Sequence, residues 1–536
     1  MPPPPFMFHL LQGIDARHAS VLLKCAIAIW ATMLLAWRAS PANAGGRGIP
    51  FADKTLAVLG LLAVLSWWHV GAYQFGVAFH RWEFFHYYLG AKYSPELGYT
   101  RLYDCSAAAE AEDSPSPELL TRWTRNLETN VMERGSPAAI EPGLCRSRFT
   151  PARWLEFKHD VLFFREEAKT DWLRMQQDHG YNATPVWNAA GYLLANTGPA
   201  TKRQMVLIAL IDPALLALMW VAVWRTFGWR PAAVAAIWWG TNFPARYFYL
   251  GGSFVRSDFL VAAVLAVVLA KRGYMMMAGA ATCWSTLLRI FPGFLISGPV
   301  VRALTGEPGA RSSLKRSLGP LVRFAAGGCI AVCVLIPFSL LSPPGGVSAG
   351  IGRWTGFVRN SDKHLSGSSV NRVGLKPLLS FTRGGDYRSL RDFWIENPDD
   401  AWQAVRHQTF QGRRWLFWGL TAAFLVLLGL AARGQPYWVA LVLGVGLIPI
   451  VSDIACYYYG ILLVYGLLWD RYPWTGVGLA SLSVFTLIAG ELSSTEEVRY
   501  LIISAGIVFY VFAVTGGIAR SNMAAWRQRV IEQPAA

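Results

Sequence analysis

The stretch His80–Asp104, HRWEFFHYYLGAKYSPELGYTRLYD, decides how the chain is organised, because an apolar run leads into it and a long polar segment follows. The apolar run, Thr55–Phe79, is long enough to cross a bilayer as a helix. Residues 80–203 are polar, and apolar segments occupy most of the chain after them. We therefore expect Glu83 to lie at the membrane–water interface, just beyond the end of a membrane helix.

Aromatic side chains crowd around Glu83 in the sequence. A carboxylate that is desolvated by aromatic rings has a raised pKa and can serve as a general base. The same rings are also typical of the belt of Trp and Tyr at a membrane interface, in which case Glu83 is simply solvated beside them. Both interpretations stay open at this point. The residues concerned are Tyr73, His80, Trp82, Phe84, Phe85, His86, Tyr87 and Tyr88.

The composition indicates a polytopic membrane protein. Of the 536 residues 54% are hydrophobic, which is more than a soluble domain of this size contains. The net charge of +16 is explained by basic cytoplasmic loops, and no compact basic patch favours nucleic-acid binding. We expect an all-α helical bundle of about 11–13 membrane segments. The apolar runs lie near 19–37, 55–79, 204–224, 232–250, 254–270, 274–301, 324–342, 414–432, 437–451, 455–469, 476–490 and 499–519.

The charges in the loops predict the topology. The basic loop 302–323 should be cytoplasmic, but a single helix over 274–301 would place it outside. The conflict disappears if the run breaks near 288–292, at Leu-Arg-Ile-Phe-Pro, and doubles back, because proline and a buried arginine both disfavour a continuous membrane helix. Five regions follow: 1–79 with the N-terminal tail and two membrane helices, an outer segment 80–203, membrane helices in 204–342, a second outer loop 343–413, and C-terminal membrane helices in 414–536.

Within the first outer segment the sequence predicts two helices. One begins at Pro117 after Ser116 and runs to Arg134, and the other begins at Pro151 and ends at Gly180. In the second outer loop, the glycines of 345–352 predict a flexible connection.

Seven cysteines are present, and five lie within apolar runs. Cys105 and Cys145 lie in the outer segment, where an oxidising compartment would allow a disulfide between them. No cysteine or histidine spacing indicates zinc, and we expect no cofactor, although a divalent cation stays possible.

Three sets of charged or polar residues are candidates for chemistry. Arginines beside a membrane-embedded site suit a lipid-linked phosphate, because the guanidinium fork binds phosphate oxygens bidentately. Arg256 has a structural alternative, pairing with Asp258 or reaching to the interface, and each loop residue taken singly has the alternative of ordinary solvation. Arg289 in mid-run is costly unless it is paired or functional. The sets are Arg246, Arg256 and Asp258; Arg289; and, in the second outer loop, Lys363, His364, Asn371, Arg372 and Lys376.

These motifs, in this order, resemble the GT-C class of polytopic glycosyltransferases, and within it the mannosyltransferases that use polyprenyl-phosphate-mannose. Members typically read Asp-x-x-x-Tyr-x-x-x-Ala, followed by a glycine and a Leu-Tyr pair. They later carry a Gly-Gln-x-Asn-like helix start and a Lys-x-x-Pro end. Here Glu replaces Asp, Arg replaces Lys, and the Gln-x-Asn pair is absent. The matching positions are Glu83, Tyr87, Ala91, Gly98, Leu102, Tyr103, Gly252 to Asp258, and Arg289 to Pro292.

The resemblance implies transfer of a sugar, mannose or another hexose or pentose, from a polyprenyl phosphate to a glycan, lipid or protein acceptor. Glu83 would be the base, oriented by His86 or Tyr87, and Arg256 and Arg289 would stabilise the leaving phosphate. Tyr88 and the three charged sets would help to bind substrate. The expected location is a bacterial inner membrane with the site on the outer face. The alternative is a transporter or lipid-handling protein without catalysis, because broken helices and buried arginines fit that class too.

Overall fold

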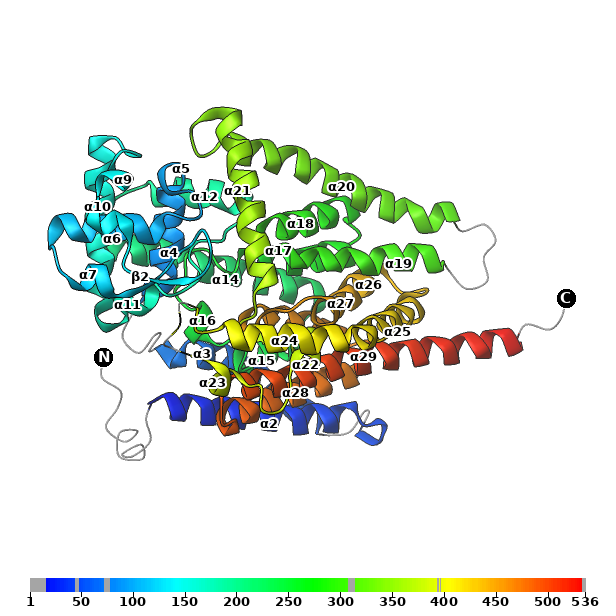
Figure 1. The fold of residues 1–536 in the computed structure, drawn as a ribbon. Helices are drawn as coiled ribbons and strands as arrows, with labels where there is room; N and C mark the ends of the chain where they lie inside the picture. Colours follow the sequence, from blue (N-terminus) through cyan, green and yellow to red (C-terminus); the bar gives the residue numbers. More distant parts are fainter. Residues whose placement is uncertain are drawn as a thin grey trace.

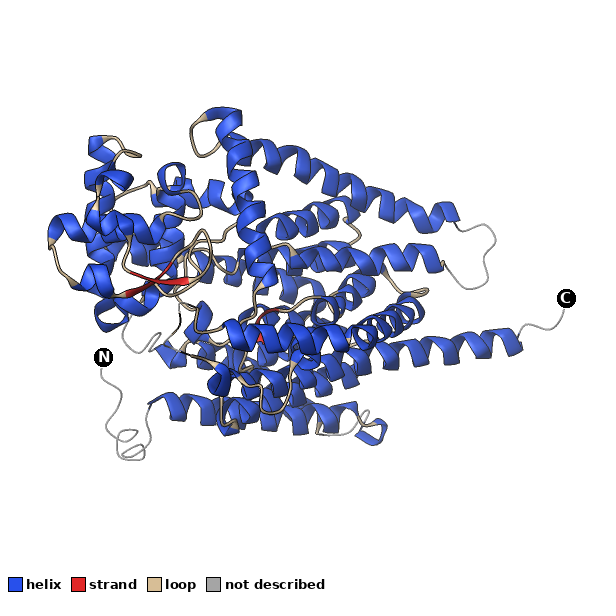
Figure 2. Ribbon diagram, in the orientation of Figure 1, coloured by secondary structure: helices blue, strands red, loops and turns tan. Residues whose placement is uncertain are grey.

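The computed structural model describes residues 16–43, 48–71, 78–306, 314–392, 395 and 397–532. Helices account for 77% of the structure, and the described strands form two short antiparallel pairs (Figure 2). These are β1 (Trp123–Arg125) with β2 (Met132–Arg134), and β3 (Arg372–Val373) with β4 (Ile454–Ala455). The expectation of an all-α polytopic membrane protein is confirmed.

Seven helices in the described residues are long and apolar enough to cross a bilayer. Other predicted membrane segments fold as shorter helices, because the apolar run 232–250 is interrupted at Asn242 and the run 437–451 at Val445-Gly446. The long spans are α2 (Ala16–Ala39), α3 (Ile49–Trp67), α13 with α14 (Lys202–Ala209, Ile211–Phe227), α20 (Leu314–Leu341), α25 (Arg414–Ala432), α28 (Pro473–Leu492) and α29 (Glu496–Glu532). The shorter helices are α15 (Trp229–Thr241), α17 (Asp258–Lys271), α18 (Met275–Leu288), α19 (Ser297–Thr305), α26 (Tyr437–Gly444), α27 (Leu447–Val451) and η5 (Cys456–Leu468).

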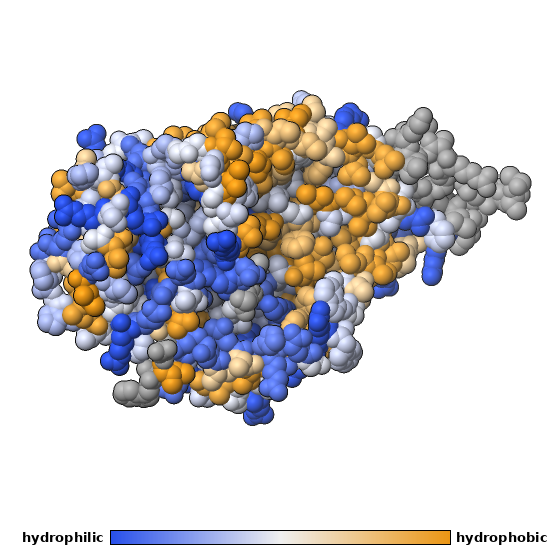
Figure 3. All heavy atoms as spheres, turned by 45° about the horizontal axis from the view of Figure 1, so that its top comes forward, coloured by the Kyte–Doolittle hydropathy of each residue, from blue (hydrophilic) through white to orange (hydrophobic). Residues whose placement is uncertain are grey.

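The bundle has two different ends (Figure 1). One end carries the segment 80–203, and the opposite end holds the C-terminal ends of α19, α25 and α29. Figure 3 shows hydrophilic side chains on the left of the molecule, over the first end, and apolar side chains gathered over the long helices to the right. This division is the one expected of a helical bundle in lipid with a polar segment outside it.

The apolar run 274–301 breaks near Arg289, within the segment 288–292 where the charges of the loops predict a break. Helix α18 ends at Leu288, Arg289 is extended, and a 3₁₀ helix η4 (Phe291–Ile296) leads into α19. The chain turns back toward the end opposite 80–203, so the flanks of the 302–323 loop lie there (Figure 1).

The second membrane helix ends earlier than predicted. Helix α3 stops at Trp67 instead of Phe79, because His69 and Val70 adopt positive φ values of 50° and 57°. The next described helix is α4 (Arg81–Lys92), at whose start the His80 side chain accepts the Glu83 backbone N–H at 3.3 Å. Glu83 therefore lies in the first turn of a new helix and not on a loop after a membrane span.

The helix predicted from Pro117 to Arg134 is wrong beyond its first turn. Helix α7 (Glu118–Thr121) is short, and the β1–β2 hairpin follows it. The Asn126 side chain accepts the backbone N–H groups of Glu128 and Thr129, and Asn130 has φ of 64°, so the local chemistry of asparagine forms a turn.

The helix predicted from Pro151 begins as expected, with the Thr150 hydroxyl accepting the Arg153 N–H. Its helix α10 (Pro151–Ala168) ends where Lys169 has φ of 52°, and the short helices η3 (Lys169–Asp171) and α11 (Trp172–Met175) continue. The rest of the outer segment consists of α5 (Ser94–Leu97), α6 (Leu102–Asp113), α8 (Pro137–Ile140), α9 (Gly143–Arg146) and α12 (Pro185–Ala195). A disulfide joins Cys105 of α6 to Cys145 of α9, as predicted, with the Cα atoms 5.3 Å apart.

The second outer loop is ordered around a helix, so the flexible connection predicted at 345–352 is wrong. Helix α21 (Gly346–Ser366) begins there, and its Phe357 packs against Tyr99 of the first outer segment. Asn360 donates a hydrogen bond to the Tyr181 carbonyl at 3.3 Å. The two outer segments therefore pack together at one end of the bundle. Helices α22 (Leu375–Ser380), α23 (Tyr387–Leu390) and α24 (Asp400–Gly412) complete the loop.

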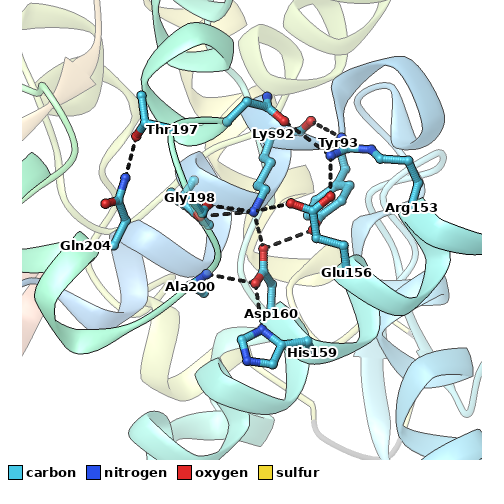
Figure 4. A network of polar contacts seen from close by, with 12 residues as sticks. Lys92, Tyr93, Arg153, Glu156, His159, Asp160, Thr197, Gly198, Ala200 and Gln204 are labelled. Atoms are coloured by element: carbon cyan, nitrogen blue, oxygen red, sulfur yellow. Dashed lines mark hydrogen bonds and ion pairs between the residues drawn. The ribbon is translucent and has the colours of Figure 1, made fainter.

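A buried ionic network fixes helix α4 in place (Figure 4). Lys92, at the end of α4, lies 2.8 Å from both Glu156 and Asp160 of α10, and Lys92 and Asp160 are fully buried. Asp160 also accepts the Ala200 N–H at 2.8 Å, while Lys92 donates to the Gly198 carbonyl at 2.9 Å. The network thus joins α4 and α10 to the segment that leads into the membrane helix α13.

Candidate functional site

Glu83 is held at the start of α4 against a turn that lies about 170 residues later in the sequence. Its side chain is buried, with 6% of the residue exposed. One carboxylate oxygen accepts the Phe254 N–H at 2.7 Å, and the other lies 3.2 Å from Nη1 of Arg256. Burial raises the pKa of the Glu83 carboxyl, and the Arg256 guanidinium and the Phe254 N–H only partly oppose this. A buried carboxyl of this kind is suited to accept a proton.

The turn that carries Arg256 is strained and is clamped from two sides. Gly252 has φ of 69° and Val255 has φ of 49°, which is unusual for a β-branched residue. On the side opposite Glu83, the Asp212 carboxylate of α14 accepts the N–H groups of Arg256 and Ser257 at 2.9 and 3.0 Å. A backbone with such rare φ values persists only where the surroundings hold it, and the hydrogen bonds to Glu83 and Asp212 do so here.

Aromatic rings surround the Arg256 guanidinium. Its central carbon lies 5.2 Å from the ring centre of Tyr87, 4.7 Å from that of Tyr457 and 5.8 Å from that of Tyr458. These rings favour a desolvated cation. The Tyr87 hydroxyl donates in turn to Asn182, so this ring is held in its position.

Arg289 lies beside this cluster with unused hydrogen-bonding capacity. It is 8% exposed, its guanidinium stacks 5.9 Å from Trp187, and Nη1 donates to the Leu288 carbonyl at 2.8 Å. Its Nε and Nη2 are buried and find no acceptor within the described residues, and the same holds for Nε of Arg256. Buried donors without a partner cost free energy, and an anionic ligand would satisfy them.

Asp258 starts helix α17 and accepts its neighbour's backbone N–H, from Phe259, at 2.7 Å. No ion pair between Asp258 and Arg256 is formed, and Arg256 pairs with Glu83 instead. The positive charge of Arg289 acts on both Asp258 and Glu83. The site therefore gathers three carboxylates and two guanidinium groups.

Three of the predicted site residues face elsewhere. The two ring nitrogens of His86 are occupied by the Trp82 carbonyl and, on the other side, by the Tyr103 hydroxyl and the Met175 carbonyl. Tyr88 donates to Gly198 in the ionic network around Lys92. Arg246 stacks on Phe243, 3.9 Å from its ring centre.

Of the residues predicted in the second outer loop, Asn371, Arg372 and Lys376 form a neighbouring group, whereas Lys363 donates to the Leu127 carbonyl. Arg372 and Lys376 both lie near Asp453, at 3.1 and 3.4 Å. The Asn371 carbonyl accepts the Cys456 N–H. Asn371 therefore lies beside the residue that immediately precedes Tyr457 and Tyr458 in the chain. The side chain of His364 lies outside the described residues.

Comparisons with known protein families, curated proteins and solved structures find no match for this chain. Within the part of the chain that the structure describes, no three His, Cys, Asp or Glu side chains are grouped as a metal site would require.

Sequence reasoning missed Asp212 and the pair Tyr457–Tyr458. The signal for Asp212 was present, because a single acid inside the apolar run LIALIDPALLALMW is costly unless it is paired. The tyrosines stand at the start of an apolar run and look like an interfacial belt. Only their position around Arg256 distinguishes them from one.

Proposed function

We propose that this protein is a membrane glycosyltransferase that moves a sugar from a polyprenyl phosphate to an acceptor hydroxyl on the outer face of the membrane. The observation that carries the proposal is the contact between the buried Glu83 carboxylate and Arg256, with unpaired donors of Arg289 beside them. A base and a phosphate-binding cation act on opposite sides of one sugar carbon, roughly 6–10 Å apart with the reacting groups between them, so the donor has to part Glu83 from Arg256 when it binds.

In the proposed reaction Glu83 takes the proton of the acceptor hydroxyl as its oxygen attacks the anomeric carbon. The bond from that carbon to the phosphate oxygen breaks, and its electron pair leaves with the polyprenyl phosphate. Arg256 and Arg289 bind the phosphate and stabilise the charge that develops on the leaving oxygen. The sugar is transferred with inversion, because attack and departure occur on opposite sides of the carbon.

The Glu83–Arg256 pair gives the donor a second role. While the pair is intact, both Glu83 oxygens hold hydrogen bonds. A donor phosphate carries the charge and geometry to compete for the Arg256 guanidinium. Its binding would draw Arg256 away from Glu83 and free one carboxylate oxygen for the acceptor, so the base would become available only when donor is present.

The experiment measures donor binding and transfer separately on the purified protein. A short-chain polyprenyl phosphate tests binding. A panel of polyprenyl-phosphate hexoses and pentoses, supplied with a mixture of glycan, lipid and peptide acceptors, tests transfer through the release of polyprenyl phosphate. We expect Glu83→Gln to lower transfer by roughly 10²–10⁴-fold while polyprenyl phosphate still binds. We expect Arg289→Gln to weaken binding roughly 10- to 100-fold, because a hydrogen bond to a charged group is lost.

Arg246→Gln is the matched control, because Arg246 also has a buried Nη1 without an acceptor in the described residues, but its guanidinium stacks on Phe243 and not on the rings around Arg256. It should bind polyprenyl phosphate as the parent protein does. Equal binding by Arg289→Gln and Arg246→Gln would contradict the phosphate role. Binding without transfer of any sugar, unchanged by Glu83→Gln, would instead favour a lipid-handling protein.

A further inference from the structure

Two adjoining pockets lie at the end of the bundle opposite Glu83, between the ends of α19, α25 and α29. One has a volume of about 240 Å³ and a mainly apolar lining, and the other has a volume of about 400 Å³ and a mixed polar lining. They share Leu430 and Arg433, so an apolar groove opens directly beside a polar pocket. The groove is lined by Thr305, Val426, Gly429, Leu430 and Arg433; the pocket by Leu430, Arg433, Gly434, Gln435, Arg471, Tyr472, Ser521, Asn522, Met523, Ala525 and Trp526.

The polar pocket is built from fixed side chains. Asn522 of α29 donates to the carbonyls of Leu430, Ala431 and Arg433, which end helix α25. Gln435 is 3% exposed and donates to Asn522 and to the Tyr472 hydroxyl. The helix end is therefore capped by an amide and by Gly434 at φ of 68°, and does not need a basic side chain for this purpose.

Two arginines at the opening of the polar pocket, Arg433 and Arg471, contact aromatic rings and are not paired with a described carboxylate. Arg433 stacks against Trp526, with 5.9 Å to its ring centre, and Arg471 against Tyr472, at 5.6 Å. In the described residues no carboxylate lies within 4.0 Å of either guanidinium. Both side chains are exposed and both belong to the end of the bundle that the charge rule places in the cytoplasm.

We infer that these pockets form a binding site for an anionic phospholipid of the inner leaflet. Its phosphate would lie between Arg433 and Arg471, with headgroup hydroxyls on Ser521 and Tyr472. One acyl chain would follow the groove beside Gly429. A basic pocket between membrane helices is the usual form of an anionic headgroup site. The continuous apolar groove favours a lipid over a free phosphate, because a free phosphate has no acyl chain to fill the groove. This inference is independent of the glycosyltransferase proposal.

The test compares lipids that differ only in the headgroup. Detergent-purified protein is titrated with phosphatidylglycerol or phosphatidylcholine of the same acyl chains, and bound lipid is counted by native mass spectrometry. We expect phosphatidylglycerol to bind more tightly. The double change Arg433→Gln with Arg471→Gln should weaken it roughly 25-fold, because each arginine near an anionic headgroup contributes about fivefold.

Arg225→Gln with Arg272→Gln is the matched control, because it removes the same charge from exposed arginines at the same end but outside both pockets. A second variant, Gly429→Leu, fills the groove without changing charge. A Cβ there would meet only side-chain atoms, 3.9 Å away, so the fold should tolerate it. We expect Gly429→Leu to weaken phosphatidylglycerol binding and the control pair to leave it unchanged.

Three results would overturn the inference. These are equal binding of the two lipids, equal losses in the pocket and control pairs, and unchanged binding in Gly429→Leu. Competition by free glycerol phosphate at the affinity of the lipid would also overturn it, because the occupant would then be a soluble phosphate and not a membrane lipid.

Discussion

At the scale of single residues, two opposing influences set the proton affinity of Glu83. Burial favours the neutral acid, and the Arg256 guanidinium with the Phe254 N–H favours the carboxylate. The desolvation effect is the larger, so the pKa of Glu83 lies above its ordinary value of 4.5. A base of this kind is protonated, and therefore inactive, over a wider acidic range than an exposed glutamate.

This gives a pH prediction with a definite sign. Transfer should rise with pH as Glu83 loses its proton, and the midpoint of this limb in kcat/KM should lie above 4.5. Arg256→Met removes the charge that lowers the pKa, so the limb should move to higher pH. Glu83→Gln should abolish the limb along with most of the activity. A limb that survives in Glu83→Gln would show that another group is the base.

Asp212 supports a second prediction, because its two oxygens accept the backbone N–H groups of Arg256 and Ser257. In Asp212→Asn only one oxygen remains, and the new NH₂ group faces a donor. Leaving one buried N–H unpaired should lower stability by about 1–3 kcal/mol and displace Arg256, so transfer should fall as well. Thermal unfolding and the transfer assay measure the two effects.

Asp258→Asn is the matched control for stability, because Asp258 accepts a single backbone N–H that an asparagine oxygen can still accept. An Asp212→Asn protein as stable and as active as the parent would mean that Asp212 does not position the turn.

That Glu83 and Arg256 belong to one site could be predicted from the sequence, but the role of Asp212 could not. The former followed from a family resemblance that orders the motifs along the chain. The latter depends on hydrogen bonds to backbone N–H groups more than 40 residues away. Such bonds leave no trace in the residue types involved, because every non-proline residue carries the same donor.

At the scale of helices, the position of Glu83 depends on the Lys92 network at the other end of α4 (Figure 4). Lys92→Met would leave Asp160 buried without its cation, and breaking a buried ion pair in this way costs about 3–5 kcal/mol. The double change Lys92→Met with Asp160→Leu removes both charges. It should therefore be less destabilising than the sum of the two single changes, as measured by a double-mutant cycle.

The cycle also has a result that would contradict this account. Strictly additive losses would show that Lys92 and Asp160 do not interact energetically, despite their 2.8 Å separation. Arg165→Met with Asp113→Leu is a comparison pair, because that ion pair joins α10 to α6 at the partly exposed surface and should couple by less than about 1 kcal/mol.

Helix prediction succeeded where end signals and periodicity agreed, and failed where they did not. Thr150-Pro151 caps α10, and the apolar face from Trp154 to Ala168 is buried. Between Pro117 and Arg134 the apolar spacing fits a helix equally well, but Asn126 and Asn130 form a turn. Apolar spacing alone cannot decide between a short helix and a hairpin that pack against the same core.

At the scale of the whole molecule, the candidate site needs contributions from both parts of the chain. Glu83 belongs to the outer segment, whereas Arg256 lies just before α17, Arg289 ends α18, and Asp212 lies within the span of α13 and α14. A reaction between a membrane lipid and an acceptor outside the membrane would require this arrangement. The proposed reaction therefore requires that both outer segments lie on one side of the membrane and the 302–323 loop on the other.

Labelling with a membrane-impermeant maleimide tests that topology. The free cysteines Cys25, Cys283, Cys329, Cys333 and Cys456 are first replaced by serine or alanine, and the Cys105–Cys145 disulfide is kept. Single cysteines are then introduced at the exposed positions Ser116 and Arg383 in the two outer segments, and at Gly306, which begins the predicted cytoplasmic loop after α19. Intact cells should be labelled at Ser116→Cys and Arg383→Cys, and at Gly306→Cys only after the membrane is opened. Labelling of Gly306→Cys from outside, with Ser116→Cys and Arg383→Cys reached only after the membrane is opened, would mean that the molecule is inserted in the opposite orientation. The same membranes would then present the Glu83 site and the Arg433 pockets on sides opposite to those that their proposed ligands require.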